Sequence, residues 1–94
     1  MTAAEPDETR RKRLSMRAWR RGTREMDLIL GPWADAHLAD LEPARLLAFD
    51  ALLDEADQDL AQWFVAGRPA PADHAPLVAE IAAFALARLR PGGA

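Results

Sequence analysis

Apolar residues recur at helical spacing along most of this chain, and no stretch reads as a β-strand. Alanine and leucine dominate, whereas valine and isoleucine occur twice each and tyrosine is absent, a balance that favours helices. The pattern predicts helices at about residues 8–21, 23–38, 43–53, 57–65 and 75–89. Because the connections between them are short, we expect an all-α fold, a compact five-helix bundle in a single small domain.

Glycine, proline and one threonine suggest where these helices begin and end. Gly22 is a reasonable stop for the first helix, and Thr23 is a suitable cap for the second. Pro43 fits the first position of the third helix, where its missing N–H has no cost. Gly31-Pro32 interrupts the second helix, and the helical pattern on both sides predicts a kink there and not an end.

A length of 94 residues predicts a single domain. Half of the residues are hydrophobic and 29% are charged, which is typical of a globular chain and not of a disordered one. We expect the helical bundle to cover residues 9–90, with disordered tails at residues 1–8 and 91–94.

The amino-terminal residues are acidic and lack the apolar core of a signal peptide. No apolar stretch approaches the roughly 18 residues that span a bilayer. Cysteine is absent, which fits a reducing compartment. We therefore expect no membrane insertion and a cytoplasmic location, and the Ala- and Arg-rich composition suggests a bacterial protein.

The net charge of -3 conceals a sharp asymmetry. Eight of the 12 basic residues lie in residues 10–24, whereas residues 25–67 hold ten acids and a single base. Such a dipolar chain can orient on a partner, or its two ends can pair with each other or face water; charge alone does not separate these readings. The basic segment could also contact nucleic-acid phosphates, but the acidic remainder and a pI near 5.3 argue against that partner.

Residues suited to catalysis, metal binding or nucleotide binding are few. The single serine, Ser15, lies far in sequence from His37 and His74, so no nucleophile with a neighbouring base is indicated. The histidines lack metal-motif spacing, and the acidic run at residues 54–59 lacks the central glycine and terminal glutamate of a calcium loop. No glycine-rich phosphate loop is present. We expect no catalytic residue, no metal site and no cofactor held stably by this chain.

One short segment stands out, the run Arg-Gly-Thr-Arg-Glu at residues 21–25. If it is helical, Arg21, Gly22 and Glu25 share one face. Gly22 would leave bare backbone for the close approach of a second surface, and Glu25 would present a carboxylate among arginines. This arrangement predicts a binding surface. The alternative is that Gly22 only ends the first helix while Glu25 pairs with Arg21 to stabilise the second.

The same segment lies within the run RAWRRGTREMDLIL at residues 17–30, which resembles the succinate dehydrogenase assembly factors, flavinylation factors whose signature is RGxxE. The similarity continues through FDALLDEADQDL at residues 49–60 to Trp63 and ends at residues 67–70. RGxxE alone is a weak pattern, but the ordered set of runs is a strong one. The resemblance covers roughly residues 13–85.

This resemblance implies a five-helix bundle that binds the flavoprotein subunit of succinate dehydrogenase, or of fumarate reductase in some bacteria. It implies that the chain promotes covalent attachment of FAD to a histidine of that subunit, as a binding chaperone and not as an enzyme. By position it assigns the partner-binding signature to Arg21, Gly22 and Glu25. To these we add three flanking contacts, Arg17, Arg20 and Arg24.

A small bundle with a charged face could serve other partners, because a fold does not fix a function. The alternative function is an antitoxin-like or regulatory interaction module, with nucleic-acid binding less favoured. Capture of a flavoprotein subunit, as against salt-sensitive binding to nucleic acid, separates these classes.

Overall fold

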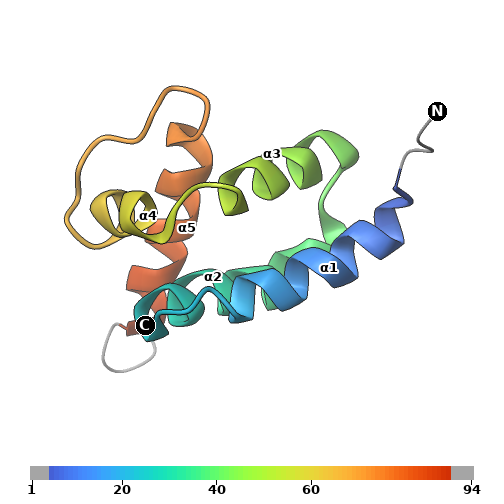
Figure 1. The fold of residues 1–94 in the computed structure, drawn as a ribbon, viewed down its shortest axis with the longest axis horizontal. Coiled ribbons are helices and arrows are strands. Elements are labelled where there is room, and N and C mark those ends of the chain that lie inside the picture. The colour runs from blue at the N-terminus through green and yellow to red at the C-terminus, as the bar shows by residue number, and fades with distance from the viewer. Residues whose placement is uncertain (1–4, 90–94) are drawn as a thin grey trace.

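A computed structural model of the chain describes residues 5–89. Within them lie five α-helices and no strand (Figure 1). The helices are α1 (Asp7–Trp19), α2 (Arg24–His37), α3 (Pro43–Leu53), α4 (Asp57–Phe64) and α5 (Ala75–Leu89), with the 3₁₀ turn η1 (Leu38–Asp40) after α2. The predicted all-α, five-helix fold is confirmed.

The largest departure from the predicted boundaries is at the end of α1. The first helix was expected to reach residue 21, but it ends at Trp19, and residues 20–23 form a loop in which Gly22 has a φ of 97°. At its other end, Asp7 and Glu8 belong to α1 and not to a tail, because acids in a first turn are favoured by the helix dipole. Residues 1–4 and 90–94, which include most of the predicted tails, lie outside the described residues.

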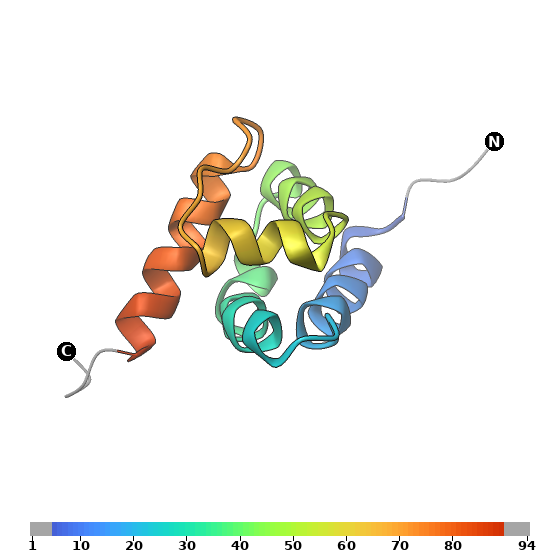
Figure 2. The same ribbon diagram turned by 60° about the vertical axis from the view of Figure 1, so that its left-hand side comes forward.

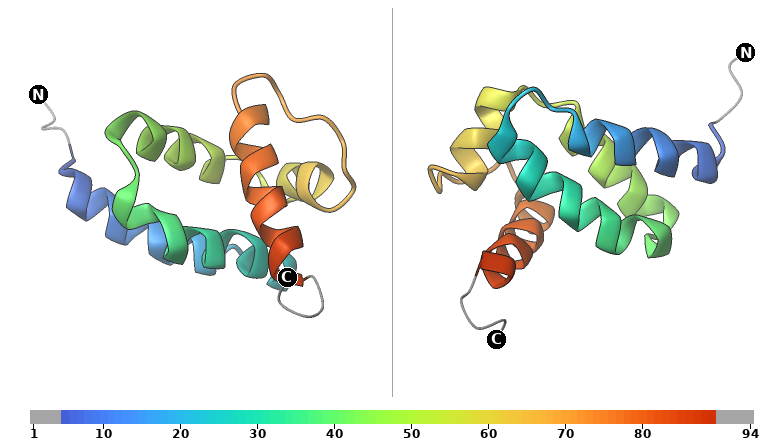
Figure 3. Two further views of the ribbon diagram at one scale, coloured as in Figure 1. Left: turned by 180° about the vertical axis from the view of Figure 1, so that it is seen from behind. Right: turned by 90° about the horizontal axis from the view of Figure 1, so that it is seen from below.

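The helices place the loop at residues 20–23 beside α4. α1 and α2 run alongside each other and α3 packs on α1 (Figure 1). α2 lies between α1 and α5, as the turned views in Figures 2 and 3 show. α4 contacts both α2 and α5, so the connection from α1 to α2 and the start of α4 meet at one end of the molecule.

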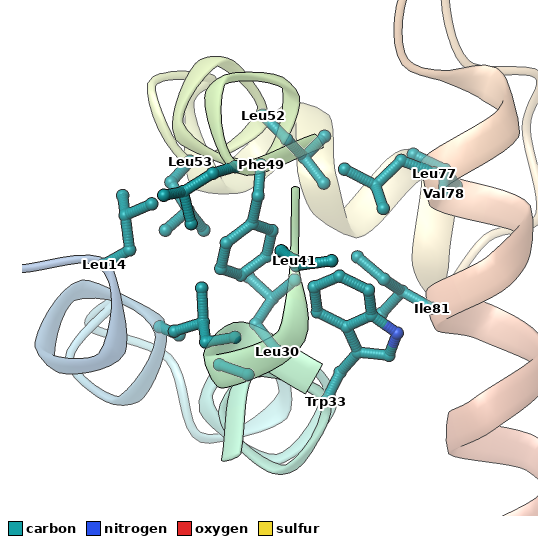
Figure 4. Close-up of a cluster of buried hydrophobic side chains, with 14 of the residues drawn as sticks. Leu14, Leu30, Trp33, Leu41, Phe49, Leu52, Leu53, Leu77, Val78 and Ile81 are labelled. Atoms are coloured by element: carbon teal, nitrogen blue, oxygen red, sulfur yellow. The ribbon is translucent and has the colours of Figure 1, made fainter. Parts of the chain in front are cut away.

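The core is formed by apolar side chains from all five helices, and Figure 4 labels those of α1, α2, α3 and α5. Trp33 and Phe49 are fully buried at its centre, with ring centroids 5.0 Å apart. Leu14 enters from α1 and Leu60 from α4, and Ile81 joins them from α5. Each helix therefore contributes buried side chains to one contiguous hydrophobic core.

α2 continues through Gly31 and Pro32, so the prediction that the helix does not end there is confirmed, whereas the predicted kink stays a prediction. Gly31 is buried because the indole of Trp19 packs directly on it, and a methyl group at this position would overlap the ring. Trp19 Nε1 also donates a hydrogen bond to Asp35 Oδ1 at 3.1 Å. Gly31 is therefore the residue that lets the end of α1 approach α2 closely.

Four of the eight basic residues at positions 10–24 form ion pairs within the protein. Arg13 bridges Glu5 at 2.8 Å and Asp50 at 2.7 Å, and Arg10 and Arg17 also approach Asp50. The hydrogen bond from Arg13 holds the pKa of Glu5 below its usual value. The pairs with Asp50 join α1 to α3. The charge pattern left open whether the basic residues orient the chain on a partner, pair internally or face water; these three arginines pair internally.

Candidate functional site

The segment at residues 21–25 is a loop followed by the first turn of α2. Gly22 has a positive φ, which L-residues rarely adopt, and Thr23 then caps α2 by accepting a hydrogen bond from the Met26 N–H at 3.3 Å. The expectation that Arg21, Gly22 and Glu25 share one helical face is therefore wrong, because only Glu25 lies on a helix. A Cβ at Gly22 would meet Asp57 at 3.7 Å, an ordinary contact, so backbone conformation and not internal space requires the glycine.

Arg21 turns inward and binds the connection between α3 and α4. Its Nε donates to Asp57 Oδ1 at 2.9 Å and its Nη2 to the Glu55 carbonyl at 2.7 Å, while Nη1 donates to the Leu53 carbonyl. The side chain is only 10% exposed. Since three of its donors are used within the protein, Arg21 fixes the loop against the start of α4.

The backbone of Arg21 is fixed as well. Its N–H donates to Asp27 Oδ1 at 2.7 Å, which ties the loop to the first turn of α2. With the Thr23 cap, these bonds hold both sides of Gly22 in place. Sequence reasoning missed Asp27 and Asp57 as positioning residues. The acid-rich run at residues 54–59 was a signal for Asp57, but helical spacing could not show which of its acids meets an arginine.

Arg17 has a similar internal role. Its Nη2 donates to the Leu53 carbonyl at 2.8 Å and approaches Asp54 at 3.2 Å. Leu53 is the last residue of α3, where the helix dipole favours cations. Arg17 and Arg21 thus converge on the end of α3, and neither guanidinium is presented outward in the way the binding prediction assumed.

Gly22, Arg24 and Glu25 face solvent, as does Arg20 at the start of the loop. Within residues 5–89 no ion pair joins Glu25 to Arg21; the ion pair of Arg21 is with Asp57. The pairing alternative, in which Glu25 stabilises α2 through Arg21, is therefore not observed. The predicted site separates into an inward part, Arg17 and Arg21, and an outward part that we call the signature surface: Arg20, Gly22, Arg24 and Glu25.

Glu25 also borders a hollow of about 680 Å³ between the start of α2 and α4. Met26, Ala61 and Val65 supply apolar walls, and Asp57 lies on the same wall while it holds Arg21. The exposed carboxylate of Glu25 thus stands at the edge of a concave, largely apolar surface, which suits contact with another molecule.

The other candidate groups have structural partners. His74 Nε2 lies 2.8 Å from Glu55 Oε2, and His37 Nδ1 lies 3.0 Å from the Trp33 carbonyl. Among the residues that the structure describes, no group of three or more His, Cys, Asp or Glu side chains could hold a metal ion. In the same part of the chain no helix is long and apolar enough to cross a bilayer.

The chain is similar to proteins of known role. The family described as flavinator of succinate dehydrogenase, Sdh5, matches residues 12–85. A protein of Mycosarcoma maydis named succinate dehydrogenase assembly factor 2, mitochondrial, is 42% identical over 69 residues, covering 73% of this chain and 29% of its own length. A protein of Cryptococcus neoformans with the same name is 41% identical over 68 residues, covering 72% and 39%. The chain spans well under half the length of these two relatives.

Proposed function

The chain belongs to the Sdh5 family, the flavinators of succinate dehydrogenase, and from this premise we propose that it binds the flavoprotein subunit of that enzyme and promotes covalent attachment of FAD to a histidine of the subunit. It acts as a binding chaperone and not as an enzyme, and FAD is held by the client. The observation that carries this proposal is the signature surface, in which an exposed Glu25 is presented beside a rigidly fixed loop.

Rigidity matters because ordering a loop on binding costs free energy. Here Arg21 and Thr23 fix the loop before any partner arrives, through hydrogen bonds to α4 and within α2. Gly22, which lies between Arg21 and Thr23, is exposed and has no side chain. A client can therefore approach the backbone closely while Glu25 meets a donor or cation on its surface.

The chain promotes flavin attachment by positioning. It holds the flavoprotein in a conformation in which the client histidine and the flavin ring are correctly placed, and placement of this kind can contribute several kcal/mol to a reaction. Glu25 carries specificity, whereas the exposed Arg20 and Arg24 pair with acids of the client. Arg17 and Arg21 take part by positioning, because their guanidinium groups bind the end of α3 and the start of α4.

The proposed client is succinate dehydrogenase, or fumarate reductase, and the proposed location is the cytoplasm of a bacterium, as the Ala- and Arg-rich composition suggests. The fungal relatives are mitochondrial by name. We propose no nucleic-acid partner, because Arg10, Arg13 and Arg17 pair with acids within the protein and residues 25–67 hold ten acids and one base.

The test is to produce a flavoprotein subunit in cells that lack their own assembly factor, with and without this chain. Covalent flavin is then read as in-gel fluorescence of the denatured subunit, and the tagged chain is used to capture its partner. We expect the chain to raise the fluorescence and to capture the flavoprotein. Equal fluorescence with and without the chain would contradict the proposal.

A further inference from the structure

The hollow beside Glu25 is the first of three adjacent hollows. A second, of about 330 Å³, lies between α2, the end of α4 and α5, and shares Glu25 and Val65 with the first. A third, of about 170 Å³, shares Ile29 and Ala85 with the second and reaches Leu86 on α5. We call this row of adjacent hollows the α2–α5 groove.

The groove gathers exposed apolar side chains. Six large hydrophobic residues are exposed in the described part of the chain, and three of them, Leu28, Val65 and Leu86, line the groove. Exposed apolar side chains scattered singly need no explanation, but a contiguous patch marks a surface that is covered by a partner. The concentration on one face therefore indicates an interaction surface.

We propose that the α2–α5 groove binds an apolar segment of the client flavoprotein that carries a basic side chain, which pairs with Glu25; this inference rests on the proposed function. Glu25 lines both the first and the second hollow, and apolar side chains line each of them as well. An occupant that covers the walls also desolvates this carboxylate, and a buried charge is costly unless it is paired. Lysine or arginine flanked by apolar residues is the complement of that arrangement.

The other charges along the groove are compatible with this occupant. Asp57 already accepts a hydrogen bond from Arg21, so its charge does not require a cation from the occupant. Arg88 lines the second hollow and is exposed, and an arginine can cover apolar surface with its stem while its guanidinium stays in water. Of Glu25, Asp57 and Arg88, Glu25 is thus the residue whose charge the occupant has to pair with a cation.

The extent of the groove also supports a flavoprotein ligand. A stable protein interface buries about 800 Å² on each partner, more than the few residues of the signature surface supply. The groove lies on both sides of Glu25 and extends towards α5, so one client can cover both the groove and the signature surface. We take the flavoprotein and not a second copy of this chain as the occupant, because the groove lies beside the signature surface that the proposed function assigns to the flavoprotein.

The experiment compares exposed apolar residues inside and outside the groove. Leu28→Asp and Val65→Asp place a charge in the groove. The controls Met16→Asp and Leu47→Asp place a charge outside it, on α1 and α3. Leu28 is 49% and Met16 54% exposed, so these two positions are matched in exposure. The dissociation constant is measured against a purified flavoprotein subunit, and each melting temperature is recorded. We expect the groove variants to weaken binding at least about tenfold and the controls about twofold or less.

Leu86→Asp, on the exposed side of α5, repeats the test if Leu28→Asp lowers the melting temperature. Groove variants that bind the subunit as tightly as the wild type, while Glu25→Gln binds weakly, would overturn the groove and leave the proposed function standing. Loss of self-association in the groove variants, with unchanged affinity for the flavoprotein, would assign the groove to a second copy and overturn the inference. A wild-type chain with no affinity for the subunit would overturn the proposed function itself.

Discussion

Arg21 Nε lies 2.9 Å from Asp57 Oδ1, and this ion pair joins the loop before α2 to the first residue of α4 across 36 positions of sequence. Two backbone carbonyls at the end of α3 and just beyond it share the same guanidinium. Glu25, four residues later, faces solvent. The RGxxE signature therefore combines an inward residue that sets geometry with an outward residue that is free to meet a partner.

Arg21→Ala should lower stability, because it removes hydrogen bonds from a charged donor and leaves Asp57 without its ion pair. We expect a loss of about 2–3 kcal/mol in the free energy of unfolding, measured by urea denaturation. Arg20→Ala is the control, since Arg20 is exposed, and its effect should stay within about 0.5 kcal/mol. Equal stability of the two variants would remove the positioning role of Arg21.

Gly22→Ala and Gly22→Asn separate backbone conformation from close approach. Alanine at a positive φ is strained by about 1–2 kcal/mol, whereas asparagine enters this region more readily, so we expect Asn to be the more stable variant by thermal unfolding. Both side chains cover the exposed backbone, and both variants should bind the flavoprotein more weakly. Wild-type affinity in the asparagine variant would show that Gly22 serves conformation alone.

The sequence predicted much of the fold because local signals place several helix ends. Pro43 and Asp57 begin α3 and α4 as expected, since proline and acidic residues suit a first turn. The predicted end of α1 was wrong because a glycine can lie directly after a helix or a few residues beyond its end. The spacing of apolar residues does not distinguish these two cases. The Arg21–Asp57 pair was beyond prediction, because it depends on how the connection between α3 and α4 folds back on the loop.

Gly31→Ala should destabilise the protein, because a methyl group would overlap the Trp19 indole and force α1 away from α2. Overpacking of this kind costs about 1–3 kcal/mol, which a urea titration resolves. The double variant Gly31→Ala/Trp19→Ala tests the cause. If the indole is the obstacle, Gly31→Ala should cost less in the Trp19→Ala background than in the wild type; an equal cost in both backgrounds would assign the effect to something else.

Arg24→Glu should slow association with the flavoprotein, because exposed charges at the edge of an interface act mainly on the association rate. Lys12→Glu, on α1, is a control with the same change in net charge. Stopped-flow or surface-based kinetics at low salt should show a reduction of several-fold to about tenfold for Arg24→Glu, with a weaker dependence on ionic strength. The same reduction in both variants would point to net charge and not to a local contact.

The most direct test of the central claim measures covalent flavin on the client together with the melting temperature of Glu25→Gln, a variant that keeps the shape of the side chain and removes its charge. Glu25 is exposed, so the melting temperature should stay within about 2–4 °C of the wild type. In-gel flavin fluorescence of the flavoprotein subunit should fall to the level seen without the chain. Undiminished fluorescence with this variant would contradict the account.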